Sequence, residues 1–209
     1  MACLDHSRWQ GGLERGLSEL DSLKLLERCG ALLTGHFCLS SGRHSNRYLQ
    51  CAVALQHPYI AERLGVALAD RVTAIGKEPP GAVVSPALGG LIIGHETGRA
   101  LKVRACFVEQ VNGRITLRRG FNLAPNEPVL IVEDVVTTGL SSREAMQAVE
   151  ASGGRPIGLA CIANRGGHAC IAKLPVTALV ALNFTSWDER DCPLCASGQT
   201  IDKPGSRKP

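Results

Sequence analysis

The stretch VLIVEDVVTTGLSS, residues 129 to 142, places four apolar residues directly before two carboxylates, and then small hydroxyl residues around one glycine. A continuous apolar run is typical of a strand buried on both faces, as in a parallel sheet covered by helices. In open α/β sheets, ligands bind at the loops that lead from such strands into helices. Glu133 and Asp134 would repel each other at the strand end unless a ligand uses both groups. The stretch therefore predicts an α/β fold with a ligand site at this strand end.

Further apolar runs along the chain support the same interpretation. Helical periodicity is present over about residues 20–29, and Pro58 stands at a favourable first position for a second helix that extends to about residue 72. Between them, GHFCLSSGRHSNRYLQCAVAL contains two half-apolar runs around a turn, which predicts a small N-terminal hairpin, or hood. The later apolar runs alternate with helical or glycine-rich segments, as in a mainly parallel sheet flanked by helices. Strands are predicted at AVVS (82), ACFV (105), VLIV (129), IGLACIA (157) and VTALVAL (176).

The length and composition of the chain indicate a single domain. Its 209 residues, 44% of them apolar, can form one sizeable core, and the periodicity is lost from about Ser186 onward, which predicts a packed tail with a loose end. We expect one domain over residues 1–209, with a substrate-side helix and hairpin at 18–56, an α/β core at 57–185 and a tail at 186–209.

Charge and hydropathy exclude several classes of protein. The formal net charge is only +4, which does not indicate a nucleic-acid partner. No run of about 18 apolar residues occurs, and the first residues, MACLDHSRWQGGLERG, carry charges where a signal peptide has its apolar stretch. We therefore expect a cytoplasmic protein with no membrane and no nucleic-acid partner.

The cysteines are interpreted as reduced core residues rather than as a disulfide framework. There are nine, an odd number, and most of them occur singly in apolar context. The cysteines of this kind are Cys29, Cys51, Cys106, Cys161 and Cys170.

One cysteine pair has a different pattern. Cys192-Pro-Leu-Cys195 has the spacing of a metal or redox site, but a zinc site needs four ligands, and no second C-x-x-C or paired histidine lies near it in the sequence. We expect a structured turn in the C-terminal tail and assign no metal directly. A site shared across a dimer, or with His168 and Cys170, stays open.

The residues after the strand at 129 predict a phosphate site. Thr and Ser hydroxyls, small residues that let backbone N–H groups close around an anion, and a following helix N-terminus all favour a phosphate. Ser141 could cap that helix, with Glu144 three residues later. Glu133 and Asp134 should then face a sugar and accept hydrogen bonds from two vicinal hydroxyls, with Mg²⁺ nearby to offset charge. The ligand implied by these acids and the phosphate cradle is a ribose 5-phosphate. Two other phosphate loops are set aside, because neither G-x-x-x-x-G-K-[ST] nor a G-x-G-x-x-G after a strand occurs.

VLIVEDVVTTGLSS closely resembles the phosphoribosyl pyrophosphate (PRPP) motif of the type I phosphoribosyltransferases. Both have four apolar residues, two acids, two further apolar residues, and then Thr-Thr-Gly and small residues. The resemblance implies the type I phosphoribosyltransferase fold and a PRPP site formed by Glu133, Asp134, Val135, Val136, Thr137, Thr138, Gly139, Leu140 and Ser141.

Other segments resemble the orotate phosphoribosyltransferases in particular. FCLSSGRHSNRYL (37–49) is similar to their substrate-side hairpin, F-x-L-x-S-G-x-x-S-x-x-Y, and CPLC followed by KPGSR resembles the tail of a short bacterial subgroup. CIANRGG places Arg165 where that family has an arginine that receives the base. PALGGLIIG resembles the pyrophosphate loop, which would comprise Ala87, Leu88, Gly89 and Gly90. The resemblance covers about residues 18–207.

This resemblance implies that the chain makes orotidine 5′-monophosphate and pyrophosphate from orotate and PRPP, with Mg²⁺, as a homodimer in pyrimidine synthesis. The chemistry of the residues agrees, because the guanidinium of Arg165 can accept the orotate carboxylate in bidentate fashion. Thr137 is interpreted as a hydroxyl donor to base or phosphate. Reaction at the anomeric carbon should pass through an oxocarbenium-like state, so positioning and electrostatics would carry the rate, and no nucleophilic cysteine is required.

The predicted closing loop departs from the family pattern. Many orotate enzymes have Arg-Lys followed by Lys-x-His in a mobile loop that reaches across the dimer, whereas FVEQVNGRITLRRGF (107–121) has Glu109 and Gln110 and no histidine. A hairpin lysine is replaced by Ser40, and Arg43 is either a substrate contact or a turn residue. The candidate catalytic substitutes are Arg114, Arg118 and Arg119, which could also form only a solvated basic hairpin.

Two other functions stay open at this point. A purine phosphoribosyltransferase would share the PRPP motif and would present a late aromatic stacking residue, which Phe184 or Trp187 could supply. A non-catalytic RNA-binding regulator on the same fold would need a coherent basic face and could lose the pyrophosphate loop.

Overall fold

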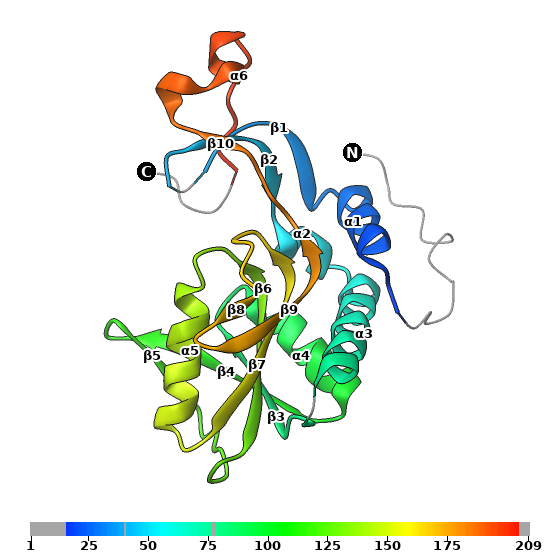
Figure 1. The fold of residues 1–209 in the computed structure, drawn as a ribbon, viewed down its shortest axis with the longest axis vertical. Coiled ribbons are helices and arrows are strands. Elements are labelled where there is room, and N and C mark those ends of the chain that lie inside the picture. Colours follow the sequence, from blue (N-terminus) through cyan, green and yellow to red (C-terminus); the bar gives the residue numbers. More distant parts are fainter. Residues whose placement is uncertain (1–15, 40, 77, 205–209) are drawn as a thin grey trace.

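The computed structural model describes residues 16–39, 41–76 and 78–204, and its centre is a seven-stranded sheet (Figure 1). The strand order is β5-β4-β3-β6-β7-β9-β8. The five central strands are parallel, while β5 and β8 add antiparallel edges. The strands are β3 (Ala82–Pro86), β4 (Arg104–Val111), β5 (Arg114–Leu117), β6 (Pro128–Val136), β7 (Arg155–Asn164), β8 (Cys170–Ile171) and β9 (Leu174–Ala181). All five strands predicted from apolar runs are confirmed.

Helices cover both faces of this sheet (Figure 1). The helices α3 (Pro58–Ile75) and α4 (Gly90–Leu101) lie on one face, and α5 (Leu140–Ala151) lies on the other. Successive side chains of a strand point to opposite faces, and β6 obeys this rule. Leu130 and Val132 belong to the core with α3 and α4, whereas Val129 and Ile131 belong to the core with α5. Burying each such side chain contributes roughly 1.5–3 kcal/mol, so the continuous apolar run holds both layers to the sheet.

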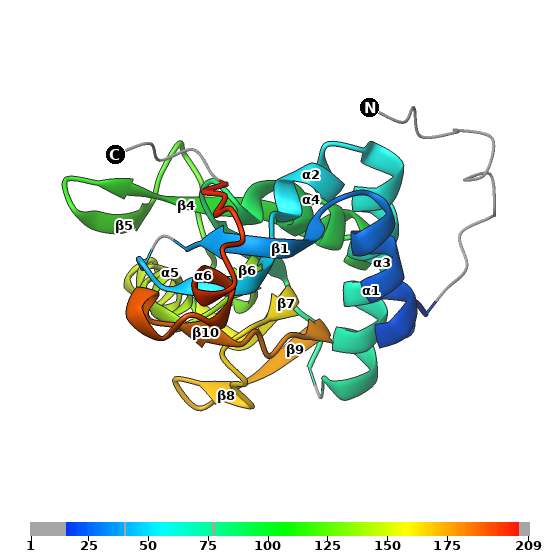
Figure 2. The same ribbon diagram turned by 90° about the horizontal axis from the view of Figure 1, so that it is seen from above.

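A second, three-stranded sheet lies beyond one end of the main sheet (Figures 1 and 2). We call it the hood; it consists of β1 (Leu32–Cys38), β2 (His44–Leu49) and β10 (Ser186–Trp187), all antiparallel. The predicted hairpin is therefore confirmed, although Ser40 in its turn lies outside the described residues. The remaining helices are α1 (Glu19–Arg28), α2 (Cys51–Leu55), the 3-10 turn Glu189–Asp191 and α6 (Pro193–Ala196).

Arg43 joins the hairpin to the tail. Its guanidinium donates to the hydroxyl and the carbonyl oxygen of Ser186 at 3.0 and 2.7 Å, and pairs with Asp188 at 2.8 Å. Together with the pairing of β10 to β2, these bonds fold the tail back onto the hairpin. Arg43 is therefore a structural link in this chain.

Several local predictions are confirmed and two are wrong. Pro58 is the first residue of α3. Ser141 does not cap α5, because the helix begins at Leu140 after Gly139, which has a left-handed φ of 72°. Cys170 is exposed, because it lies on the two-residue edge strand β8. The other predicted core cysteines are buried, and all eight cysteines in the described ranges are free; they are Cys29, Cys38, Cys51, Cys106, Cys161, Cys170, Cys192 and Cys195. Within the described ranges, every helix is too short or too polar to span a membrane.

Candidate active site

Two loops meet at the carboxyl ends of the central strands. Because β3 and β6 are parallel neighbours, the loops that follow them lie at the same edge of the sheet. One loop contains the predicted pyrophosphate-loop residues Ala87, Leu88 and Gly89, and Gly90 begins α4. The other contains Thr137, Thr138 and Gly139 of the PRPP motif, and Leu140 and Ser141 begin α5. The fold thus brings together the two segments that the sequence singled out.

The two acids of the motif point to different helices. Glu133, which is 5% exposed, accepts hydrogen bonds from the hydroxyls of Ser141, at 2.9 Å, and of Ser142 in the first turn of α5. Asp134 lies on the α4 side, where a Cβ on Gly89 would be 2.7 Å from its carboxylate. This divergence follows from strand alternation, which continues the pattern of Val129 to Val132. The pair is therefore separated by the sheet rather than left in mutual contact.

Burial controls the ionisation of both acids. Desolvation raises the pKa of Glu133, and the two serine hydroxyl bonds oppose that rise. Desolvation likewise raises the pKa of Asp134, opposed mainly by the backbone N–H of Val135, which donates to it at 2.8 Å. Each carboxylate also lies beside the N-terminus of a helix, where negative charge is favoured. The site thus holds two acids ready to accept hydrogen bonds in a partly water-excluded setting.

Two side chains bind the backbone of the loop after β6, while the two threonines of the loop are exposed to solvent. The ring of His168 donates to the carbonyl oxygen of Thr137 at 2.7 Å, and Arg143 donates to that of Thr138 at 2.9 Å. Thr137 and Thr138 themselves are exposed. The first turn of α5 has N–H groups without intrahelical acceptors, as in any helix. These features together form a cradle for an anion. Sequence reasoning missed the supporting roles of His168 and Arg143, since neither has a distinctive spacing.

Gly139 is required in this cradle for two reasons. Its φ of 72° lies in the left-handed region, which residues with a side chain rarely adopt. In addition, a Cβ at this position would lie 2.4 Å from the side chain of Ile171 on β8. The short edge strand therefore packs directly under the loop and fixes its shape.

Arg165 lies next to the motif, at the end of β7. Its N–H donates to the carbonyl oxygen of Val136 at 2.8 Å, and its guanidinium carbon is 4.8 Å from the ring centroid of Phe184. Burial lowers the pKa of Arg165, and the nearby hydroxyl of Tyr48 from the hood opposes that effect. The Nε atom of Arg165 is buried and has no hydrogen-bond partner among the described residues. An unpaired buried donor of this kind is suited to an anionic ligand.

The three arginines of the predicted closing loop lie in the hairpin of β4 and β5 or directly after it. Arg114 begins β5 and Arg118 follows it, on a hairpin that projects from the edge of the sheet (Figures 1 and 2). Arg119 forms a bidentate pair with Glu109, with both N–O distances at 3.0 Å, and this pairing lowers the pKa of Glu109. Glu109, which stands where the family resemblance expects an arginine, thus serves to hold Arg119.

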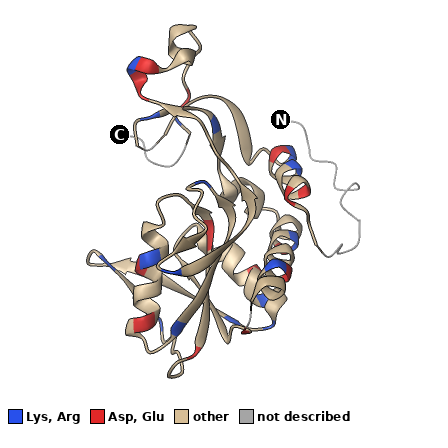
Figure 3. Ribbon diagram, viewed as in Figure 1, with Lys and Arg blue, Asp and Glu red and all other residues tan. Residues whose placement is uncertain are grey.

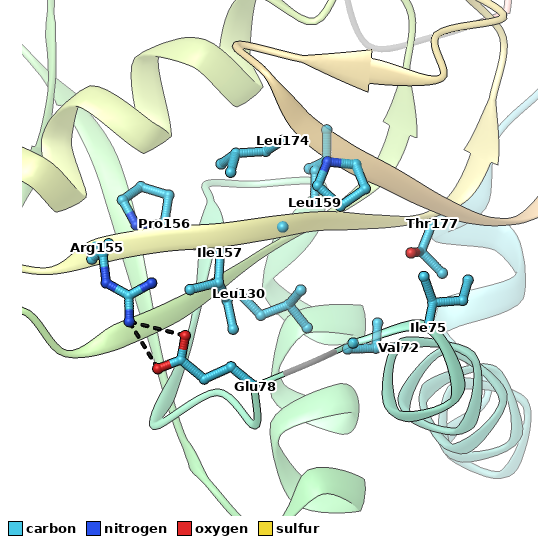
Figure 4. Close-up of a pocket in the computed structure, with 13 residues that line it drawn as sticks. Val72, Ile75, Glu78, Leu130, Arg155, Pro156, Ile157, Leu159, Leu174 and Thr177 are labelled. Carbon is cyan, nitrogen blue, oxygen red and sulfur yellow. Dashed lines mark hydrogen bonds and ion pairs between the residues drawn. The ribbon is translucent and has the colours of Figure 1, made fainter.

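A separate apolar pocket lies at the other ends of the strands, where β7 and β9 begin (Figure 4). Its lining includes Leu130, Leu159 and Leu174, together with Arg155, which pairs with Glu78 at 2.8 Å. None of residues 133–141 of the PRPP motif and none of residues 87–90 of the pyrophosphate loop lines it. This pocket is therefore distinct from the candidate active site.

Comparison with known proteins agrees with the site. Residues 54–173 match the family model described as a phosphoribosyl transferase domain, and they include the motif, the pyrophosphate loop and Arg165. The fold is also that of an adenine phosphoribosyltransferase from Thermoanaerobacter pseudethanolicus, which is 15% identical with a TM-score of 0.55 over 65% of this chain and 88% of that one. The class of protein defined by the fold and the site is thus a type I phosphoribosyltransferase, as the sequence predicts.

The relatives define the family more narrowly. The orotate phosphoribosyltransferase of Novosphingobium aromaticivorans is 52% identical over 177 residues, 85% of this chain and 91% of that protein. That of Pelotomaculum thermopropionicum is 47% identical over 184 residues, 88% of this chain and 95% of that protein. The Mycobacterium tuberculosis enzyme, solved with PRPP, is 25% identical with a TM-score of 0.59, covering 78% of this chain and 96% of that one. The chain belongs to the orotate phosphoribosyltransferase family.

Proposed function

We propose that this enzyme transfers the phosphoribosyl group of PRPP to orotate, releasing diphosphate and forming orotidine 5′-monophosphate, in the cytoplasm. The observation that carries the choice of base is the buried, unpaired Nε donor of Arg165 beside the PRPP motif. Orotate is a planar pyrimidine with a carboxylate, and a guanidinium fork can accept that group in bidentate fashion. Neither a purine nor uracil has a carboxylate that could accept a hydrogen bond from this Nε donor.

Arg165 is well placed to receive a base. It lies at the carboxyl end of β7, with Phe184 against its guanidinium and Tyr48 of the hood close enough to influence its ionisation. The stacking on Phe184 restricts the orientation of the fork, which reduces the entropy lost when it binds a carboxylate. In this proposal, Thr137 on the neighbouring loop donates its exposed hydroxyl to the base or to the phosphate.

The PRPP side of the proposal uses the two loops. The 5-phosphate would bind to the hydroxyls and N–H groups of residues 137–141, and the diphosphate to the backbone of residues 87–90. Asp134 and Glu133 would accept hydrogen bonds from the ribose hydroxyls, which requires Glu133 to exchange its serine partners in part. Since charge develops on the ribose and the leaving group, this fixed array would lower the barrier through positioning and electrostatics.

The residues present fit a Mg²⁺ ion that accompanies PRPP. The Asp134 carboxylate supplies hard oxygen ligands, and Gly89 leaves beside it a space that a Cβ would fill. Mg²⁺ is commonly held by one or two carboxylates together with substrate phosphates. When bound, the ion would offset the negative charge of the diphosphate. Asp134 is the residue of this chain that would hold it.

The closing loop is proposed to act between subunits of a homodimer. The hairpin of β4 and β5, in which Arg114 begins β5 and Arg118 follows it, projects from the edge of the sheet (Figures 1 and 2). In the proposed dimer these residues, with Arg119, would cover the diphosphate of the neighbouring subunit and exclude water. Arg119 would keep or exchange its Glu109 partner on closure.

The two alternative functions receive less support. Phe184 lies against Arg165, and Trp187 belongs to β10 in the hood, so neither is left as a free platform for a purine. Acidic and basic residues alternate along α1, α3 and α5, which does not produce a basic face for RNA on these helices (Figure 3).

A panel of bases tests the proposed function. The purified chain is incubated with PRPP, Mg²⁺ and orotate, uracil, adenine, hypoxanthine or guanine, and released diphosphate is measured. Orotate should support turnover far above the others. Turnover with a purine in preference to orotate would overturn the proposal, and so would the absence of turnover with every base in a folded, PRPP-binding protein.

A further inference from the structure

Four metal-ligating side chains from distant parts of the sequence meet between the hood and the tail. They are His36 on β1, His44 at the start of β2, Cys192 just before α6, and Cys195 within α6. One ligand atom from each lies within 4.8 Å of all the others. Figure 1 shows α6 standing against β1 and β2, at the end of the molecule away from the main sheet. None of the four residues belongs to the proposed PRPP or orotate site.

Four of the six distances between the ligand atoms are close to the edges of a tetrahedron around one zinc ion. With ordinary Zn–S and Zn–N bonds, a tetrahedral site has N–N edges of about 3.3 Å and S–N edges of about 3.6 Å. Here His36 Nε2 and His44 Nδ1 are 3.2 Å apart. The Sγ atoms of Cys192 and Cys195 lie 3.5 and 3.7 Å from His36 Nε2, and that of Cys195 lies 3.2 Å from His44 Nδ1. The other two distances, from Cys192 to His44 and to Cys195, are at most 4.8 Å, so the four groups lie close enough to share one ion.

The ring of His36 is held in the orientation that a metal ligand needs. Its Nδ1 atom is 2.9 Å from the carbonyl oxygen of Gln199, and a carbonyl can only accept, so Nδ1 carries the proton. The lone pair of the neutral ring is then on Nε2, which faces the cluster. A metal-binding histidine typically donates its other N–H to a carbonyl or carboxylate in this way. His36 is 2% exposed, so this arrangement is fixed within the fold.

The tail lacks an apolar core of its own. From Asp188 to Asp202, Cys192 is the only residue that is buried. The segment is nonetheless folded, with a 3-10 turn, a short helix and a return to β1, where the N–H of Asp202 bonds the carbonyl oxygen of His36 at 2.8 Å. Small segments without enough apolar burial are commonly stabilised by a metal or a disulfide. The cysteine that is buried here is one of the four candidate ligands.

We propose that His36, His44, Cys192 and Cys195 bind one structural Zn²⁺ ion, which fastens the C-terminal tail to the substrate-side hairpin. Two imidazole nitrogens and two thiolates in a tetrahedral array are a set that zinc prefers. All four positions are occupied by protein side chains, so the ion has no open position for substrate and its role is structural. The proposal adds a metal to the turn expected at Cys192 to Cys195, and the side chains beside this pair are His36 and His44 rather than His168 and Cys170.

Metal analysis of the untagged protein, purified without chelators, tests this proposal. Inductively coupled plasma mass spectrometry should find about one zinc ion per chain. The double variant Cys192→Ser, Cys195→Ser should lose the zinc, whereas Cys170→Ser, at an exposed cysteine outside the cluster, should keep it. The proposal would be overturned if the protein held iron in place of zinc, or if the double variant retained zinc. It would also be overturned if the wild-type protein were purified without metal and with a Cys192–Cys195 disulfide.

Cobalt substitution decides the question without any change of sequence. The wild-type protein is stripped of metal, with removal verified by metal analysis, and titrated with Co²⁺. One equivalent should produce the visible absorption bands of a tetrahedral thiolate site, and Zn²⁺ should abolish them. Removal should also lower the midpoint of thermal unfolding, and Zn²⁺ should restore it. An unchanged midpoint with no cobalt bands would contradict a zinc site.

Discussion

The main-chain N–H of Arg165 donates a 2.8 Å hydrogen bond to the carbonyl oxygen of Val136, the last residue of β6. The candidate base-binding arginine is thus hydrogen-bonded to the strand that contains the first part of the PRPP motif. Because β6 and β7 are paired in register up to Val136 and Asn164, the position of Arg165 relative to the phosphate loop is set by the sheet itself. The proposed sites for the two substrates are built on one rigid pair of strands.

Replacing Asp134 by Asn should stabilise the ligand-free protein at neutral pH while weakening PRPP binding. Burial raises the pKa of Asp134, so the folded state binds the proton more tightly than the unfolded chain does. Its ionisation therefore opposes folding fully above the raised pKa, and this effect disappears as the pH falls below the ordinary value of 3.8. Denaturant unfolding over a pH series measures the difference between Asp134→Asn and wild type.

The advantage of Asp134→Asn should be present at pH 7 and vanish in acid, and calorimetry should show weaker PRPP binding in the same variant. Asp70→Asn on α3 controls for the removal of a negative charge elsewhere. A variant that is less stable than wild type at neutral pH, or that binds PRPP with unchanged affinity, would show that this account of Asp134 is wrong.

Replacing Gly139 by Ala should harm both stability and PRPP binding. A left-handed φ costs a residue with a side chain roughly 1–2 kcal/mol, and here the new Cβ would also collide with Ile171 at 2.4 Å. Gly153→Ala is a matched control, since Gly153 has a φ of 88° but no atom within 4 Å of the added Cβ. Thermal unfolding should show a larger loss for Gly139→Ala, and only that variant should lose PRPP affinity. Equal losses of stability would mean that the loop moves away from β8 without penalty.

Mixing two inactive variants should restore activity if the hairpin acts across a dimer. One variant carries alanine at Arg114, Arg118 and Arg119, and the other carries Asp134→Asn. A heterodimer then contains one site with an intact PRPP motif that is covered by an intact hairpin. Random exchange should restore about a quarter of wild-type activity, because half of the dimers are mixed and each has one intact site. An absence of recovery, after native mass spectrometry has verified exchange, would place the arginines in their own subunit or outside catalysis.

The core of this fold and most of the candidate site could be predicted from local sequence. The apolar run at Val129 to Val132 is buried on both faces, so its composition alone indicated a central parallel strand. The loop residues after it could be placed because parallel strands have one edge at which ligands bind. The supporting bonds from His168 and Arg143 could not, since they depend on how later loops return to that edge.

The cluster of His36, His44, Cys192 and Cys195 shows where local reasoning fails. Metal sites are recognised in a sequence by ligands spaced a few residues apart, but His36 and Cys192 are 156 positions apart. They meet because Arg43 and β10 fold the tail onto the hairpin. Such tertiary contacts have no periodic signal. The two histidines themselves stand in a hairpin pattern that gives no sign of a metal.

Helix capping at Ser141 failed for a different physical reason. The left-handed φ of Gly139 starts α5 two residues earlier than a cap at Ser141 would, and the Ser141 hydroxyl donates to Glu133 instead. Hydrogen bonds to an ionised carboxylate are stronger than those between neutral groups, which favours the observed orientation of Ser141 toward Glu133. The general preference for serine caps was overridden by the chemistry of the site.

The central claim, that Arg165 selects orotate through its carboxylate, is tested most directly by the substitution Arg165→Leu. A charge-assisted pair contributes about 1.5–3 kcal/mol, so orotate affinity should fall roughly ten- to a hundredfold. Arg155→Leu is the matched control, because Arg155 lies at the other end of the same strand in a solvent-exposed pair with Glu78 that should contribute little (Figure 4).

Isothermal titration calorimetry of orotate and of PRPP, on wild type and both variants, is the deciding measurement. Arg165→Leu should lose orotate affinity by that factor while binding PRPP as wild type does, and Arg155→Leu should bind both normally. The discrimination of Arg165→Leu between orotate and uracil, which lacks the carboxylate, should shrink in parallel. If Arg165→Leu instead binds orotate normally, or loses PRPP binding first, Arg165 belongs to the phosphate side and does not select the base.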